Sequence, residues 1–341
     1  MSELFDEYIL NEMYFGKVPA LLQLEELFEK IKIKYQKNSV PNYAAFSNMK
    51  KDPIFKTMSD IIKEQFGFDY VIVSPSYDKS CNCHVVRFFS IKTMGTEQDT
   101  TIDYKDIRKG LSITKSGFKF KGKAPSMLII LDLGFLLAPF LHPSEMVAVL
   151  LHEIGHNFTK TTMDPEDYSD RVDEKFADAI VSMYGYGPDL ASGLNKMVTS
   201  NKYSGFASKL RNKPILNIGL GLYNIYKDIV HRQSGLEEHL PMDSRAEDIV
   251  KQLEYDLDNT PDISDDAKRE IQDQIRAIKI WIAKFNQINN YMPDKMMRFY
   301  SKHLAPHLGN EKLQDSFVKK HGTPEIINSR ITQIYNRGRK N

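Results

Sequence analysis

The chain has 341 residues with 41% hydrophobic and 27% charged content, and its formal net charge is +1. A chain of this length and composition can bury a sizeable core in one large domain or two, which excludes a fibre or a disordered tail. The balanced charge gives no overall indication of nucleic acid or of a charged membrane surface as a partner.

Residues 1–125 are expected to form an N-terminal α/β region. Helical patterns cover 2–37, with a break at 15–19, and 52–66. Val, Ile and Phe content predicts strands at 68–74 and 84–93, and an alternating pattern predicts another at 112–121.

Three features predict a soluble, intracellular protein of the cytoplasm. Residues 1–7 are acidic and amphipathic, unlike a secretory signal. The most apolar run, Met127 to Leu141, is too short for a membrane span and contains Asp132. Cys81 and Cys83 are separated by one residue, a spacing that rarely permits an unstrained disulfide and so favours a reducing compartment.

A buried strand at Ser126–Asp132 and a helix starting near Pro143 are predicted next. Proline favours the first helical position, and Glu145 places an acid in the first turn. Within this helix, His152 and His156 are four residues apart. They share one face and can therefore bind one tetrahedral metal ion.

Glu153 follows the first histidine and lies beside the metal position rather than on it. A glutamate there can act as the general base toward a water molecule activated by zinc. The alternative is a buried amphipathic helix whose histidines only satisfy hydrogen bonds. Such a helix has no need of a glutamate between the histidines, so the sequence favours one zinc ion per chain.

The third metal ligand is expected on a second helix that begins near Ser169 or Asp170. Glu174 is the predicted ligand, and the fourth position is left for water, as a catalytic site requires. Asp178, one turn later, is placed to accept the other ring N–H of a ligating histidine. Asp173 and Asp178 are the alternative ligands, and a solvated acidic helix face is the alternative without metal.

The segments from Leu141 to His156 and from Glu174 to Asp178 resemble the gluzincin metallopeptidases. The most similar family is that of the CAAX prenyl endopeptidases and bacterial heat-shock membrane proteases, although no membrane span is expected here. The resemblance covers roughly residues 126 to 245. It implies a zincin-like fold and an edge strand beside the zinc that pairs with the substrate, with Ser126–Asp132 as the candidate. A plain core strand is the alternative.

The segment from His239 to Arg245 resembles the His-Pro element of the same family, with Leu240 inserted before the proline. The resemblance implies that His239 or Arg245 stabilises the oxyanion of the tetrahedral intermediate. A surface turn capped by His239 is the alternative.

Two other motifs are not favoured as metal sites. Cys81 to His84 has no partner pair and is better explained as a loop-to-strand junction. His303 and His307 have no acid between them, and Pro306 interrupts the helix that would align them.

Helical patterns continue from Ala246 to Ile282, with a break at 259–261, and a basic tail follows from Ser316. We therefore predict an α+β, zincin-like fold that is mostly helical, with a small mixed or antiparallel sheet beside the active-site helix. Its predicted parts are an N-terminal α/β region (1–125), a catalytic core (126–245) and a C-terminal helical region with a basic tail (246–341).

The predicted function is a zinc-dependent endopeptidase that hydrolyses protein or peptide substrates, with no specific nucleic-acid partner. The alternative is a catalytically silent zincin-fold protein with a structural or interaction role, such as a bacteriophage virion component. Residues Tyr14 to Lys17 resemble the starts of peptidase-like proteins of large tailed bacteriophages. A metal-dependent hydrolase with a non-peptide substrate is a further alternative.

Overall fold

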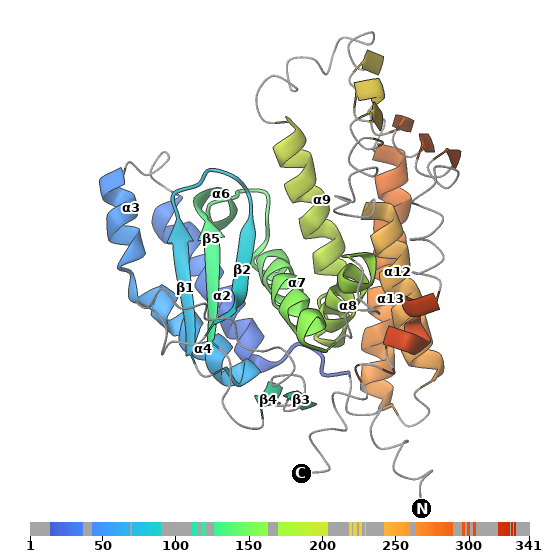
Figure 1. Ribbon diagram of the computed structural model, residues 1–341, viewed down its shortest axis with the longest axis horizontal. Coiled ribbons are helices and arrows are strands. Elements are labelled where there is room, and N and C mark those ends of the chain that lie inside the picture. The colour runs from blue at the N-terminus through green and yellow to red at the C-terminus, as the bar shows by residue number, and fades with distance from the viewer. Residues whose placement is uncertain are drawn as a thin grey trace, which may run out of the picture.

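The computed structural model in Figure 1 describes nine stretches of the chain and scattered positions near its C-terminal end. The stretches are 14–36, 43–68, 70–89, 111–114, 117–120, 126–162, 170–203, 242–259 and 263–288, and the scattered positions lie within 218–229, 295–304 and 320–331. The predicted helix before residue 15, His239, His307 and most of the basic tail fall outside these residues.

A three-stranded sheet and three N-terminal helices form one side of the molecule (Figure 1). The elements, in chain order, are α2 (Pro19–Tyr35), α3 (Tyr43–Lys50), α4 (Pro53–Phe66), β1 (Tyr70–Ser76), β2 (Cys83–Phe89) and β5 (Ser126–Asp132). Helix α4 begins where the sequence predicts, because Asp52 caps it by accepting from the backbone N–H of Ile54 at 3.0 Å. It ends at Gly67, whose φ of 67° favours glycine.

The sheet has the order β1-β5-β2, with β5 parallel to β1 and antiparallel to β2. The expectation that Ser126–Asp132 is an edge strand is therefore wrong, and the core-strand alternative is confirmed. The continuous apolar run from Met127 to Leu131 is typical of a strand covered on both faces, and pairing with both β1 and β2 gives it the central position. Strand β2 lies at the edge nearest α7 (Pro143–Thr162).

The single strand predicted at 112–121 is a hairpin. Strands β3 (Leu111–Thr114) and β4 (Gly117–Phe120) pair with each other, with Thr114 opposite Gly117. Each strand has four residues. The alternating pattern of the sequence continues through both strands, so it does not show where the turn lies.

Helix α7 passes through the middle of the molecule and contacts elements on both sides. It packs against α2 and β2 on one side and against α8 (Asp170–Met183) and α9 (Gly187–Tyr203) on the other. Val147, Leu150, Leu151 and Ile154 are all buried, as their helical spacing predicts. His152 and His156 therefore project from a helix whose apolar face is anchored in the core.

The start of α7 is held by a buried carboxylate. Glu145 accepts the backbone N–H of His142 at 2.8 Å, as an acid three residues into a helix can. Its oxygens also accept from Ser192 and from Lys196 of α9, at 2.5 and 2.7 Å. The sequence predicts an acid in the first turn, but neither this hydrogen bond to His142 nor the partners on α9.

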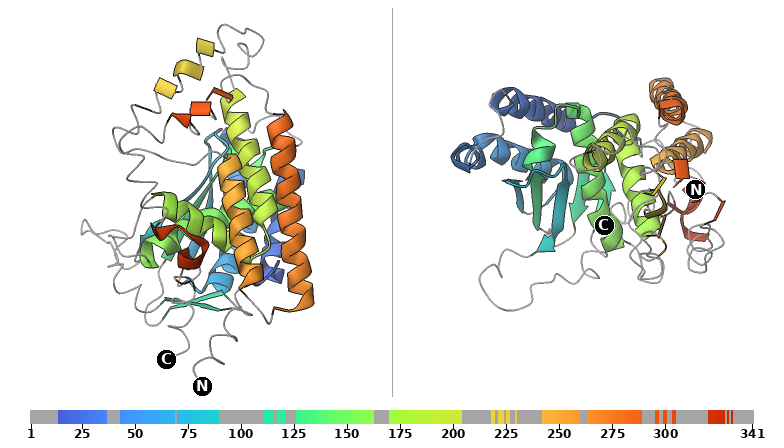
Figure 2. Two further views of the ribbon diagram at one scale, coloured as in Figure 1. Left: turned by 90° about the vertical axis from the view of Figure 1, so that its right-hand side faces the viewer. Right: turned by 90° about the horizontal axis from the view of Figure 1, so that it is seen from above.

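Helices α12 (Met242–Asp258) and α13 (Asp265–Ile288) complete the helical side of the molecule (Figures 1 and 2). They confirm the predicted helices on either side of the break at 259–261. The chain is thus mostly helical with a small mixed sheet, as predicted. The division into three parts stays a prediction. One buried cluster contains residues of all three parts, from Leu21 to Ile331.

Among the described residues, no helix has the length and apolar character needed to cross a bilayer.

Candidate metal centre

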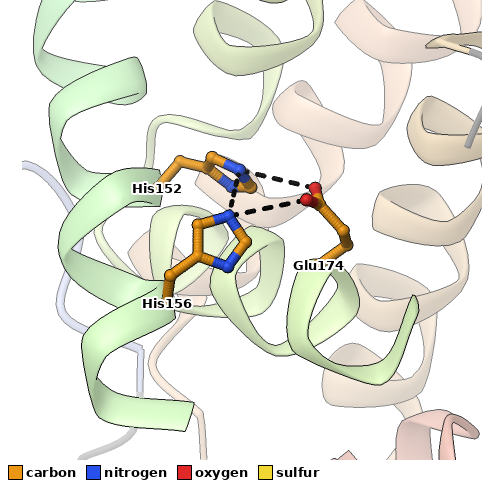
Figure 3. A group of neighbouring side chains, drawn as sticks. All are labelled: His152, His156 and Glu174. Atoms are coloured by element: carbon orange, nitrogen blue, oxygen red, sulfur yellow. Dashed lines mark hydrogen bonds and ion pairs between the residues drawn. The ribbon is translucent and has the colours of Figure 1, made fainter. Parts of the chain in front are cut away.

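Helices α7 and α8 bring three potential metal ligands together (Figure 3). His152 and His156 project from successive turns of α7, and Glu174 projects toward them from the first half of α8. Glu174 and His152 are buried, and His156 is half-buried. The predicted set of His152, His156 and Glu174 therefore forms one group that could bind a metal ion.

The atoms that face one another are the ones that ligate metals. The two Nε2 atoms lie 2.9 Å apart, and each is 3.5 Å from one carboxylate oxygen of Glu174. A tetrahedral ion with bonds of about 2.0–2.2 Å keeps its ligand atoms about 3.3–3.6 Å apart. The glutamate distances match this spacing, and the histidine pair is slightly closer.

Each histidine also has a carboxylate at its other nitrogen. Nδ1 of His152 is 2.9 Å from Asp178 Oδ1, and Nδ1 of His156 is 3.1 Å from Asp173 Oδ1. A proton on Nδ1 donated to the carboxylate leaves the lone pair of Nε2 directed at the centre of the group. Two such lone pairs 2.9 Å apart repel each other unless a cation or a proton lies between them.

The role of Asp173 differs from its predicted one. The sequence makes Asp173 an alternative metal ligand, whereas in the structure Glu174 faces the centre of the group and Asp173 faces the outer nitrogen of His156. The signal that could have found this role is its position next to Glu174. Neighbouring helical side chains point about 100° apart, so one can reach the inside of the group while the other reaches its flank.

The charge of His156 is favoured by its surroundings. Burial opposes a positive charge on the ring, but the hydrogen bond and charge of Asp173 and the charges of Glu174 and Glu153 outweigh it and raise the pKa of His156 above its usual value. The same surplus of negative charge suits a divalent metal ion.

Arg245, at the start of α12, is buried against the acids of α8. Its Nε and Nη2 lie 3.1 and 2.6 Å from the two carboxylate oxygens of Asp178, and Nη2 is 3.0 Å from Glu174 Oε2. Burial raises the pKa of Asp178, but the charge of Arg245 and the contacts with His152 and Arg245 more than offset it, so that pKa lies below its ordinary value. The oxyanion role of Arg245 stays a prediction, and its guanidinium is positioned to hold two acids in place.

Glu153 is half-buried and follows His152 directly in α7. Burial first, and then the charge of Glu153, raise the pKa of the Cys83 thiol at the start of β2 well above its usual range. Cys81 and Cys83 are both buried free thiols. Neither belongs to the group formed by His152, His156 and Glu174.

Close contact between α7 and α8 depends on Gly155. A Cβ atom at this position would lie 2.8 Å from Ala177 Cα and 3.0 Å from Ala177 Cβ. Any side chain there would force the helices apart. The small residues Gly155 and Ala177 thereby let α8 approach α7 closely enough for Glu174 to reach His152 and His156.

We expect Gly155→Ala to lower the free energy of unfolding by about 1–3 kcal/mol, because overpacking exceeds the roughly 1 kcal/mol gained in helix propensity. It should also weaken zinc binding, since α8 carries Glu174. The measurements are urea unfolding and competitive zinc titration. Gly219→Ala is the matched control, because nothing lies within 4 Å of a Cβ at that helical position. Equal stability and zinc affinity in the two variants would contradict the account.

The residues fit the metal that the sequence predicts. Two imidazoles and one carboxylate are a known ligand set of catalytic zinc, with a remaining position for water. Glu153, Asp173, Glu174 and Asp178 contribute four carboxylates, and Arg245 contributes one cation, so a doubly charged ion reduces the net negative charge.

Comparisons with protein-family models, with curated proteins and with solved structures found no match. The resemblance to gluzincins therefore stays a prediction, and the functional argument depends on the geometry of this group.

Proposed function

We propose that this protein is a zinc-dependent endopeptidase of the gluzincin type. The observation that carries the proposal is the convergence of the Nε2 atoms of His152 and His156 on the carboxylate of Glu174. Glu153 follows His152 directly in the same helix. A structural zinc site has no use for that second glutamate and tends to close its fourth position with a protein ligand.

His152, His156 and Glu174 would hold the ion. When bound, zinc supplies Lewis acidity, which polarises a carbonyl group and lowers the pKa of water to about 7. Glu153 then accepts a proton from the attacking water at its carboxylate. It passes this proton to the nitrogen of the leaving amine as the peptide bond breaks.

The surrounding acids and Arg245 keep these groups oriented. Asp178 and Asp173 lie 2.9 and 3.1 Å from the outer nitrogens of the two histidines, where a carboxylate favours the tautomer that exposes Nε2. Arg245 neutralises part of the charge of Asp178 and Glu174 and prevents the two carboxylates from repelling each other. His239 or Arg245 remains the predicted oxyanion stabiliser.

The test is removal and return of zinc in the full-length chain. A chelator strips the purified protein, metal content is measured by mass spectrometry, and cleavage of a peptide library is assayed before and after zinc is added. We expect about one zinc per chain and cleavage that disappears and returns with the ion. Cleavage by the metal-free protein would contradict the proposal, and zinc binding without cleavage of any library peptide would favour the catalytically silent alternative.

A further inference from the structure

The carboxylate of Glu174 presents both of its oxygens to the two histidines (Figure 3). Its Oε1 lies 3.5 Å from Nε2 of His156, and its Oε2 lies 3.5 Å from Nε2 of His152. These equal distances would allow a metal ion to be bound by either oxygen or by both. The histidines alone therefore leave open how many protein atoms would ligate the ion.

The contact between Arg245 and Glu174 distinguishes the two oxygens. Nη2 of Arg245 lies 3.0 Å from Oε2, the oxygen that faces His152, and 3.3 Å from Nε2 of that histidine. A positive charge and a hydrogen-bond donor at Oε2 reduce its ability to share electron density with a second cation. Oε1, which faces His156, is then the better metal ligand.

Asp178 holds the guanidinium of Arg245 in this place. The Nε and Nη2 atoms of Arg245 lie 3.1 and 2.6 Å from the two oxygens of Asp178. A two-point contact of this kind fixes the plane of a guanidinium as well as its position. Both side chains are buried, so water has little opportunity to replace either contact.

We propose that Arg245 is a positioning residue that holds Oε2 of Glu174, so that this glutamate ligates the ion through Oε1 alone. The proposal rests on the proposed metal centre of His152, His156 and Glu174, and it adds the number of ligand atoms. Three protein atoms leave a fourth position for the water molecule of a catalytic zinc site. A glutamate that ligates through both oxygens supplies a fourth protein atom and crowds that position. Arg245 thereby keeps the site open to water.

The charge of Arg245 acts against metal affinity. A guanidinium beside Glu174 repels the divalent ion that the same carboxylate attracts. Removing the guanidinium is therefore expected to strengthen metal binding and to add an oxygen ligand. A residue that only docks α12 against α8 would give neither change, since loosening two helices does not bring a further ligand to the ion. Metal affinity and coordination number together distinguish the two roles.

The test is titration of the full-length, metal-free protein with cobalt(II), whose visible absorption is much stronger in four-coordinate than in five-coordinate sites. We expect the strong absorption of a four-coordinate site in the wild type. Arg245→Met should show the weaker absorption of a five-coordinate site. It should also bind cobalt about tenfold more tightly or more, because one repelling charge is gone. Circular dichroism of the cobalt-loaded proteins checks that all variants are folded.

Lys175→Met is the matched control. Lys175 follows Glu174 in α8 and makes an ion pair with Asp248 of α12 at 2.8 Å, so this pair joins the same two helices. Its cobalt spectrum and cobalt affinity should equal those of the wild type. Arg245→Lys keeps a cation beside the acids, and it should therefore retain the four-coordinate spectrum.

A five-coordinate spectrum in the wild type or in Arg245→Lys would overturn this inference, even if Arg245→Met does not fold. A four-coordinate spectrum or weaker cobalt binding in folded Arg245→Met would overturn it too, as would equal changes in Lys175→Met. Each of these results leaves the metal centre itself in place. Failure of the wild type to bind cobalt would instead overturn the proposed metal centre, and this inference with it.

Discussion

Replacing Glu153 with glutamine is expected to lower the rate of peptide hydrolysis by about 10²–10⁴-fold, the usual contribution of a general acid–base group. Glutamine keeps the shape of the side chain but cannot accept a proton. Because Glu153 lies outside the group formed by His152, His156 and Glu174, zinc affinity should be unchanged. Single-turnover cleavage and zinc titration on the same preparation measure both quantities.

Glu64→Gln is the control for this substitution, since Glu64 is exposed on α4. It should retain both the wild-type rate and the wild-type zinc affinity. If the Glu153 variant hydrolyses peptides at the wild-type rate, Glu153 is not the base. If it loses zinc, its carboxylate is part of the metal-binding group instead.

Arg245→Met is expected to cause the largest loss of stability, about 3–5 kcal/mol in the metal-free protein. Removing one partner of a buried ion pair leaves the other charge less well compensated, and here Asp178 and Glu174 would both lose the guanidinium. Zinc should reduce the loss, since it neutralises charge in the same place. Urea unfolding with and without zinc measures the difference.

Arg269→Met is the matched control, because Arg269 makes an ion pair with Asp266 at the same 2.6 Å that joins Arg245 to Asp178. The Arg269 pair is exposed, so its loss should change the free energy of unfolding by about 0–1 kcal/mol. Equal effects of the two substitutions would contradict the role given to Arg245.

The stability difference between wild type and Arg245→Met should also narrow in acid. Because the pKa of Asp178 is lowered in the folded state, its ionisation stabilises the protein above the unfolded-state pKa of about 4. That stabilisation disappears as pH falls through the lower, folded-state pKa. Since Arg245 is its main favourable cause, the variant has less of it to lose.

The sequence predicts that His152, His156 and Glu174 come together, because local rules determine most of this grouping. Four-residue spacing fixes the two histidines on one face of α7, and the α8 pattern identifies Glu174 and Asp178. The partner of His156 was not predictable in the same way. Whether Asp173 or Glu174 faces the metal depends on the rotation of α8 against α7, which packing at Gly155 and Ala177 determines.

The fold shows the same division between local and tertiary information. Helix ends at Asp52 and Pro143 follow from capping and proline rules, and the structure has them there. Strand order depends on contacts between distant segments, so a buried strand such as Ser126–Asp132 could be predicted while its central position could not.

Zinc K-edge X-ray absorption of the zinc-loaded, full-length protein tests the central claim most directly. It should show one zinc coordinated by two imidazole nitrogens at about 2.0–2.1 Å and by oxygen ligands, as expected for His152, His156 and Glu174. A sulfur shell at about 2.3 Å would place the ion at Cys81 and Cys83 and contradict the claim. Zinc that fails to bind at all would contradict it equally.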